Sequence, residues 1–103
     1  MAQIKITTPA KLDIERTYQW WAENRSAADA AKWYEGIFDA IATLRIMPER
    51  CPAVPENDLS LKGIRQLQFG IGSRPTHRIV FNFDQQTETV TILRVRHHGQ
   101  GEL

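Results

Sequence analysis

The chain of 103 residues lacks the features that would mark a membrane or secreted protein. No apolar run approaches the roughly 18 residues that span a bilayer, and the first residues hold no apolar segment of a secretory signal. A single cysteine, Cys51, offers no disulfide framework, and its Pro-rich surroundings favour an inert thiol over a reactive one. We therefore expect a cytoplasmic protein with no membrane association.

Motifs for catalysis and cofactor binding are also missing. The sequence has no nucleophile motif, no phosphate-binding loop and no Gly-rich dinucleotide fingerprint. Its three histidines, His77, His97 and His98, have no cysteine or carboxylate cluster beside them that would complete a metal site. Adjacent histidines in a strand also point to opposite faces, so His97 and His98 cannot both bind one ion without distortion. We predict no metal and no cofactor.

Net charge is low, but the charges are unevenly placed. The formal net charge is +1, and the content of hydrophobic residues, 42%, and of charged residues, 24%, is ordinary for one globular domain. Up to Asp58 the chain holds seven Lys and Arg against nine Asp and Glu, whereas from Leu59 onward it holds six against three. We expect a single domain over residues 1–103, whose C-terminal half is the better surface for an anionic partner.

The first half of the chain predicts a strand and two helices. The run QIKITT alternates and is rich in β-branched side chains, which favours a strand. Thr8 followed by Pro9 is typical of a helix start with Thr8 as the N-cap. Ser26 predicts the N-cap of a second helix, which Pro48 ends. The short connection predicts an antiparallel helical hairpin over residues 9–47.

The spacing of apolar residues predicts which helix faces are buried. In the first helix, Ile14, Tyr18 and Trp21 lie on one face. The charged residues expected to face water are Asp13, Glu15 and Arg16. The second helix carries one apolar stripe, made of Ala30, Tyr34, Ile37, Ile41 and Leu44. We expect the tryptophans Trp20, Trp21 and Trp33 to pack in or against the core rather than bind a ligand.

Three strands are predicted after a Pro-rich loop over residues 48–62. They comprise residues 64–71, 76–83 and 89–97. Alternation in the first two strands places apolar side chains on one face, namely Leu67, Phe69, Ile71, Ile79, Phe81 and Phe83. The order β-α-α-β-β-β, with the helices gathered before the last three strands, predicts an α+β domain. In it the helical hairpin packs on one face of an antiparallel sheet.

The last hairpin has two possible registers, and the sequence does not choose between them. A five-residue loop places Ile79 opposite Leu93 and Arg78 directly opposite Arg94, where a bound anion would relieve the repulsion. A four-residue loop shifts the register by one, so that Ile79 meets Ile92 and the two arginines take different faces. Four arginines are candidates for contacts with an anionic partner: Arg65, Arg78, Arg94 and Arg96.

Four runs in this order and spacing resemble the RelE/ParE superfamily of type II toxins. They are AIATLRIMPERCP, GIRQLQFG, HRIVFNFD and VTILRVRHHGQ. In that family a central strand carries an Arg-Ile-Val/Leu-aromatic run, and the last strand ends in a tail rich in Arg and His. The resemblance covers nearly the whole chain. It implies the toxin component of a bacterial toxin–antitoxin module, of the plasmid-stabilisation type, that inhibits growth.

The resemblance implies one of two activities, because one fold supports both. RelE-like members are ribosome-dependent endoribonucleases that cut mRNA, and catalytic roles would then fall to Arg78 and to His97 or His98. ParE-like members are non-enzymatic inhibitors of DNA gyrase, and the arginines would then bind the target or the antitoxin. A third possibility is a degenerate member that keeps its antitoxin interface and has lost toxicity.

Departures from the nuclease pattern favour the ParE-like alternative. No tyrosine follows Tyr34 and no lysine follows Lys62, so the tail lacks residues that the cleavage chemistry usually employs. The run RVRHHGQ is instead similar to the tails of ParE-like members. We expect an inhibitor of DNA gyrase that forms a hetero-oligomer with a cognate antitoxin, the alternative target being the ribosome and mRNA. Acidic side chains of that antitoxin are expected to meet Arg65, Arg78 or Arg94.

Overall fold

A computed structural model describes residues 1–56 and 58–100. Its main elements are β1 (Gln3–Ile6), α1 (Thr8–Asn24), α2 (Ala27–Ala42), β2 (Ile64–Phe69), β3 (His77–Asp84) and β4 (Thr89–His97). Short 3-10 helices occupy Thr43–Arg45, Pro48–Arg50, Leu59–Leu61 and His98–Gln100. The predicted α+β class and element order are confirmed. Within the described ranges, no helix is long and apolar enough to cross a bilayer.

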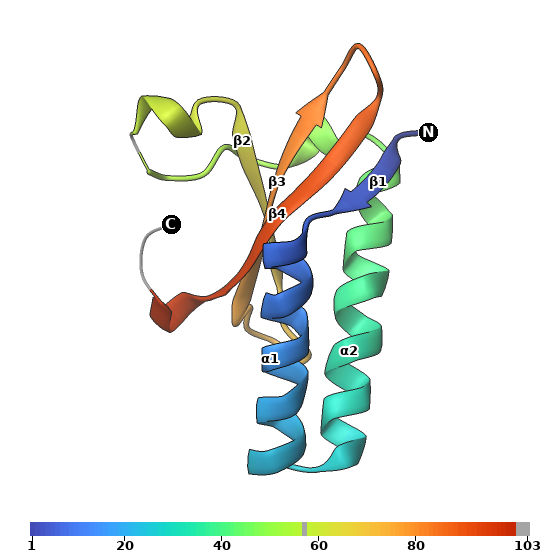
Figure 1. The fold of residues 1–103 in the computed structure, drawn as a ribbon, viewed down its shortest axis with the longest axis vertical. Helices are drawn as coiled ribbons and strands as arrows, with labels where there is room; N and C mark the ends of the chain where they lie inside the picture. The colour runs from blue at the N-terminus through green and yellow to red at the C-terminus, as the bar shows by residue number, and fades with distance from the viewer. Residues whose placement is uncertain (57, 101–103) are drawn as a thin grey trace.

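The four strands form one sheet in the order β1-β4-β3-β2. β3 is antiparallel to both β2 and β4, as predicted, whereas β1 runs parallel to β4 with Ile4 opposite Val90. The sequence did not indicate this parallel edge, because the partner of β1 lies more than eighty residues further along the chain. In Figure 1, α1 and α2 lie side by side as the predicted antiparallel hairpin.

The start of α1 is one residue earlier than predicted. Thr7, and not Thr8, is the N-cap, and its hydroxyl accepts a hydrogen bond from the Ala10 N–H at 3.3 Å. The same hydroxyl donates to the Ile92 carbonyl at 2.8 Å, so the cap also joins α1 to β4. Ser26 caps α2 as predicted and accepts from the Asp29 N–H at 3.0 Å.

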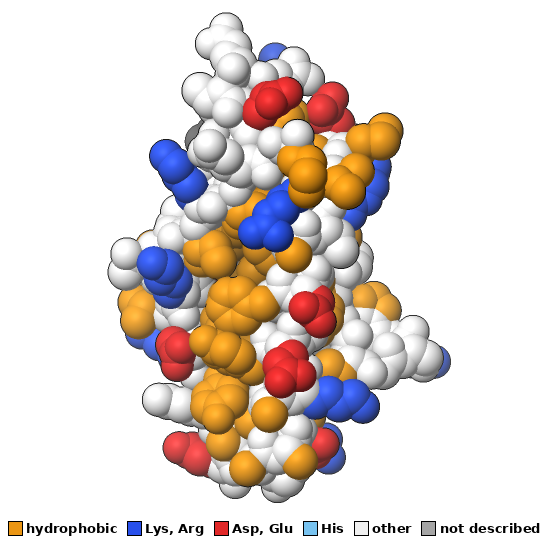
Figure 2. Space-filling model, turned by 90° about the vertical axis from the view of Figure 1, so that its right-hand side faces the viewer, with side chains coloured by type: hydrophobic (Ala, Val, Ile, Leu, Met, Phe, Trp, Pro, Cys, Tyr) orange, Lys and Arg blue, Asp and Glu red, His pale blue; other side chains and the backbone are white. Residues whose placement is uncertain are grey.

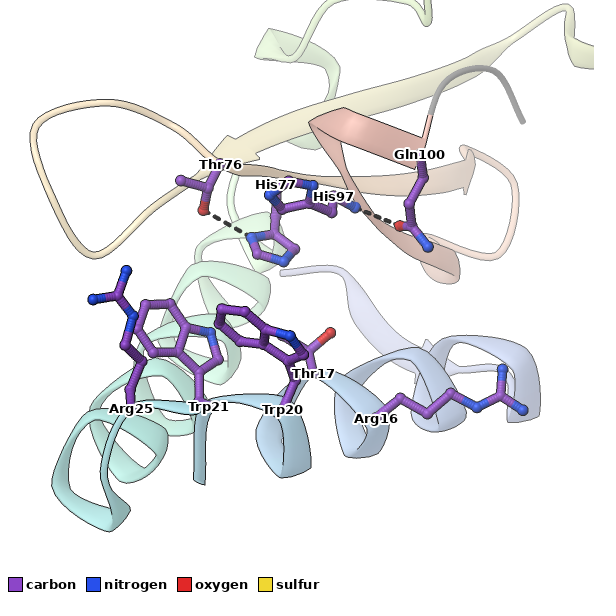
Figure 3. Close-up of a pocket in the computed structure, with 9 residues that line it drawn as sticks. All are labelled: Arg16, Thr17, Trp20, Trp21, Arg25, Thr76, His77, His97 and Gln100. Atoms are coloured by element: carbon purple, nitrogen blue, oxygen red, sulfur yellow. Dashed lines mark hydrogen bonds between the residues drawn. The ribbon is translucent and has the colours of Figure 1, made fainter. Parts of the chain in front are cut away.

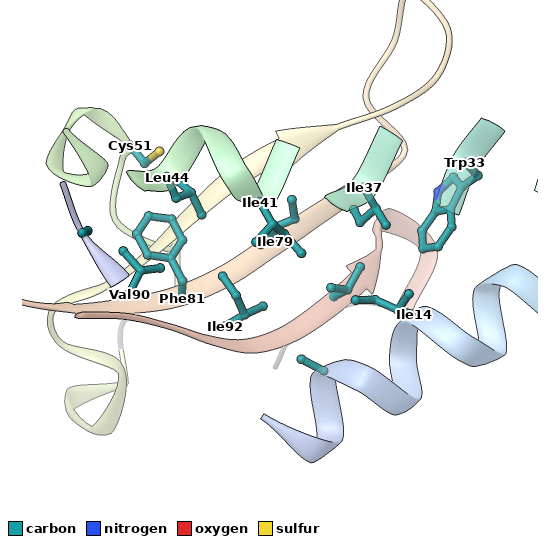
Figure 4. Close-up of a cluster of buried hydrophobic side chains, with 13 residues drawn as sticks. Ile14, Trp33, Ile37, Ile41, Leu44, Cys51, Ile79, Phe81, Val90 and Ile92 are labelled. Carbon is teal, nitrogen blue, oxygen red and sulfur yellow. The ribbon is translucent and has the colours of Figure 1, made fainter. Parts of the chain in front are cut away.

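The core fills the space between the helical hairpin and one face of the sheet (Figure 4). Ile14 of α1, Ile37 of α2 and Phe81 of β3 are all fully or almost fully buried, as their spacing predicted. In the middle of α2, Gly36 lets Phe69 of β2 approach closely, since a Cβ there would lie 2.8 Å from its ring. The absence of a side chain thus sets the distance between α2 and the sheet.

The β3–β4 hairpin follows neither predicted register. Phe81 lies opposite Ile92, but Val80 lies opposite Arg94, so Leu93 is an extra residue in a β-bulge. Both predictions for Ile79 were wrong, because its partner is Val95. Arg78 consequently faces Arg96 and not Arg94. The bulge lets Ile92 and Val95, three positions apart, both point into the core, which strict alternation forbids.

Two predictions about exposure were also wrong. Asp13 was expected in water, yet it is only 8% exposed, because it binds Arg94 across the space between α1 and β4. Trp20 was expected to pack, yet 51% of its surface is exposed. The other tryptophans agree with the prediction, since Trp33 is fully buried and Trp21 is half-buried.

Candidate functional site

The face of the sheet turned away from the core carries a polar group of side chains, here called the outer-face cluster. Its members are Gln66, Gln68, Arg78, Arg96 and His98. Arg78 lies between Gln68 of β2 and Arg96 of β4 in the strand register. Its Nη1 donates to Gln66 Oε1 at 2.9 Å, and His98 Nε2 lies 2.7 Å from Gln68 Oε1. Of the predicted site residues, the structure therefore brings together Arg78, Arg96 and His98.

Arg78 is held by a carboxylate that the sequence analysis missed. Its guanidinium donates from Nη2 to Glu56 Oε2 at 2.6 Å and from Nη1 to Oε1 at 3.0 Å, and both side chains are about nine-tenths buried. The hydrogen bond to Glu56 raises the pKa of Arg78 above its ordinary value, against the effect of burial. The positive charge is thus permanent and is balanced by Glu56. No pattern in the loop sequence marks Glu56 as a partner.

Arg94 lies apart from the outer-face cluster and attaches α1 to the edge of β4. Its Nε donates to Asp13 Oδ2 at 2.8 Å and its Nη2 to Oδ1 at 3.0 Å. Asp13 Oδ2 also accepts the Val95 N–H at 2.9 Å, which satisfies a backbone donor of β4 beyond the end of β1. The hydrogen bond to Asp13 raises the pKa of Arg94. Arg94 therefore makes a structural contact in the free protein.

The side chain of Arg65 also makes hydrogen bonds within the protein. Its Nη1 donates to the Cys51 carbonyl at 2.7 Å and to the Glu49 carbonyl at 3.2 Å, which fixes the loop before β2. Cys51 is buried, and burial raises the pKa of its thiol, in keeping with the inert role predicted for it.

The two adjacent histidines lie on opposite faces of the sheet, as expected. His98 belongs to the outer-face cluster, whereas the ring of His97 contacts that of His77 at 5.1 Å between centroids on the helix side. Burial, followed by the charges of His97 and His98, lowers the pKa of His77 to about 4, so its imidazole is neutral near pH 7. Among the described residues, no group of three His, Cys, Asp or Glu side chains is placed to hold a metal ion.

A second surface lies on the helical hairpin and is apolar. Tyr18 of α1 contacts Tyr34 of α2 at 5.3 Å between ring centroids, and Tyr34 contacts Phe38 at 4.9 Å. A depression of about 350 Å³ at the two tyrosines, here called the aromatic groove, has Glu15 and Glu35 at its rim. Figure 2 shows hydrophobic side chains gathered in a stripe along one side of the molecule, with acidic side chains beside them.

This fold is that of the RelE/ParE class of toxins. A chromosomal ParDE toxin–antitoxin system from P. aeruginosa matches with 20% identity and a TM-score of 0.73, over 94% of this chain and 96% of that chain. The RelBE2 toxin–antitoxin complex from Mycobacterium tuberculosis matches with 23% identity and a TM-score of 0.56, over 94% and 98%. A YoeB/ParE toxin from Agrobacterium tumefaciens matches with 18% identity and a TM-score of 0.57, over 93% of this chain and 98% of that chain.

At these identities the solved structures establish the fold, and a family model establishes the family. The model of the ParE toxin of type II toxin–antitoxin systems, parDE, matches residues 4–101. The chain therefore belongs to the ParE toxin family. No curated protein sequence matches it.

Proposed function

We propose that this ParE-family toxin inhibits DNA gyrase by binding and performs no chemistry of its own. The observation that carries the proposal is the pairing of Arg78 with Glu56 at 2.6 Å. A nuclease needs cations that meet the crowded phosphate of the transition state, together with a base and an acid. Here the arginine that the resemblance assigns to that phosphate is nine-tenths buried and already binds a carboxylate.

The remaining members of the outer-face cluster offer only part of that chemistry. Gln66 and Gln68 do not titrate near neutral pH, and His98 already lies within hydrogen-bond distance of Gln68. The described part of the tail brings no tyrosine or lysine to the cluster. A surface of this kind, with amides, guanidiniums and one imidazole, suits hydrogen bonding to a folded protein partner.

We propose further that a cognate antitoxin covers the aromatic groove and forms a hetero-oligomer with the toxin. Tyr18, Tyr34 and Phe38 give it an apolar anchor of the kind that a folding-upon-binding helix uses. Acidic antitoxin residues would reach Arg65, Arg78 or Arg94 only by competing with contacts inside the toxin. Apolar burial should therefore contribute more to the affinity than charge, and the affinity should fall only moderately with salt.

Controlled expression in bacteria tests the gyrase proposal. We expect growth arrest with an SOS response and gyrase-linked DNA breaks, while primer extension shows intact mRNA. Arrest without DNA breaks would contradict gyrase as the target, and absence of any growth effect would indicate a degenerate member that has lost toxicity.

The second candidate function is ribosome-dependent mRNA cleavage, and one observation favours it. Arg78, Arg96 and His98 share the outer face, the arrangement that a RelE-like site would need. Codon-phased cuts that disappear in His98→Ala and persist in His97→Ala would establish it, because His97 lies on the other face. Removing a proton-transfer group should lower the cleavage rate by ~10²-fold or more.

A further inference from the structure

A pocket outside both of these surfaces lies between the second half of α1 and the ends of β3 and β4. Its volume is about 510 Å³, within the range of sites that hold a small organic ligand. Two indoles, Trp20 and Trp21, and two imidazoles, His77 and His97, line it, with the guanidinium of an arginine toward each end (Figure 3). We call it the tryptophan pocket. His77 and His97 place it on the helix side of the sheet, opposite the outer-face cluster.

The indoles provide a flat and partly open aromatic wall. Trp20 and Trp21 meet edge to face, with their centroids 5.7 Å apart and their planes at 90°. In Figure 3 both rings rise from α1 toward His77. Trp20 is 51% exposed, so the packing of the core does not require an indole at this position. An exposed indole beside a pocket is the kind of surface on which a planar ring stacks.

The two side chains with a permanent charge that line the tryptophan pocket, Arg16 and Arg25, are positive. Arg25 holds its guanidinium over the Trp21 ring, with Cζ 6.0 Å from the ring centroid, and Arg16 lies nearer the start of α1, at the other end of the pocket. Among the described residues that line the pocket there is no carboxylate. The local field therefore favours an anion, and guanidiniums bind phosphate well because they donate two parallel hydrogen bonds.

Polar atoms inside the pocket are arranged to orient a ligand. The Gly99 N–H donates to His97 Nδ1 at 3.0 Å, so a neutral His97 carries its proton on Nε2, where it is a donor. The Thr76 hydroxyl lies 2.8 Å from His77 Nδ1, which fixes the ring of His77. Base edges offer donors and acceptors of the kind these groups recognise.

We propose that the tryptophan pocket binds a nucleotide, with the base stacked on Trp20 and the phosphate held by Arg16 or Arg25. A purely apolar ligand would not use the two guanidiniums. An extended acidic peptide would need a longer groove than this short pocket with its flat indole wall. The same chemistry is presented by a free nucleotide and by one nucleotide of a single strand.

Titration of the purified full-length toxin by calorimetry and tryptophan fluorescence tests this proposal, with AMP, adenosine, inorganic phosphate and a short oligodeoxyadenylate as probes. We expect AMP to bind more tightly than adenosine or phosphate alone. Trp20→Ala should weaken AMP binding by about 10-fold or more, because stacking contributes that much per base. Leu12→Ala, which removes another exposed apolar side chain of α1, should leave it unchanged. Arg16→Gln and Arg25→Gln should weaken AMP more than adenosine, and Arg74→Gln should not.

The probes also distinguish the two sources of the ligand. If AMP and the oligonucleotide bind equally, a free nucleotide suffices. If the oligonucleotide binds far more tightly and stays sensitive to Trp20→Ala, the site receives one base of a strand. The proposal is overturned if neither binds at millimolar concentration, or if Trp20→Ala binds AMP as the wild type does. It is also overturned if sedimentation shows a dimer that Trp20→Ala converts to a monomer, because Trp20 would then be buried against a second copy of the chain.

Discussion

At the scale of the residue, His77 is the side chain whose protonation depends most on folding. Its pKa falls from the ordinary value of 6.5 to about 4 because it is buried and lies near His97 and His98. Between these two pH values the unfolded chain binds a proton at this position and the folded protein does not. The unfolded state is therefore favoured as the pH falls, and the contribution of neutral His77 to stability is fully present only above pH 6.5.

We predict that the free energy of unfolding decreases between pH 6.5 and pH 4, by at most about 1.4 kcal/mol per pH unit from this group. His77→Gln should reduce that slope, whereas Arg74→Gln, which removes an exposed loop charge that does not titrate in this pH range, should change it little. Urea denaturation at a series of pH values measures both. Equal slopes in His77→Gln and the wild type would show that His77 is protonated in the folded protein.

Also at the scale of the residue, replacement of Phe81 tests the packing of the core. It is fully buried at the centre of β3 and packs with residues of the helices and of β4. Phe81→Ala should lower the free energy of unfolding by about 3–5 kcal/mol, because a cavity adds to the lost transfer energy. Phe83→Ala, at the partly buried end of the same strand, is the matched comparison and should cost less. A loss below about 1 kcal/mol for Phe81→Ala would mean that the core repacks without it.

At the scale of the element, the contact between α1 and β4 depends on one carboxylate. Asp13 binds Arg94 and also accepts the Val95 N–H, so its removal leaves a buried backbone donor without its acceptor. We predict that Asp13→Ala lowers the free energy of unfolding by about 1–3 kcal/mol. Glu15→Ala removes an exposed carboxylate two residues further along the same helix and should be near neutral. Equal effects of the two changes, measured by urea denaturation, would contradict the structural role of Asp13.

The elements themselves could be predicted from the sequence because their signals are local. Ser26, the alternation of β3 and the apolar stripe of α2 all act within a few residues, and the structure confirms the elements they predict. The bulge at Leu93 could not be predicted, because it depends on how the core faces of two strands match. The burial of Asp13 could not be predicted either, since its partner lies 81 residues away.

Less of the candidate site could be predicted from the sequence, because its contacts also join residues that lie far apart in the chain. The sequence indicated the cations of the outer-face cluster, but it did not reveal Glu56, whose loop has no periodicity that fixes its direction. It also assigned Trp20 to packing, because a tryptophan on a helix usually packs. An arginine is available to a ligand only if no group from a distant segment already binds it. The spacing of residues along the chain does not reveal such a group.

At the scale of the whole molecule, three surfaces lie on different parts of one small domain. The outer-face cluster is on one side of the sheet, the tryptophan pocket is on the other, and the aromatic groove is on the helical hairpin. Because these surfaces do not share residues, binding of an antitoxin and action on a target are expected to respond to different substitutions. This separation can be tested with one side chain of the aromatic groove.

Tyr34→Arg places a charge between Tyr18 and Phe38 and should prevent an antitoxin from burying its apolar face there. We predict that the variant still arrests growth when expressed alone, but that co-expression of a cognate antitoxin no longer restores growth. Tyr34→Phe keeps the ring and should be neutralised as the wild type is. A thermal melt of each variant controls for misfolding, since Tyr34 also touches the edge of the core. Full rescue of a folded Tyr34→Arg toxin would place the antitoxin on another surface, and loss of toxicity without loss of fold would show that the groove also meets the target.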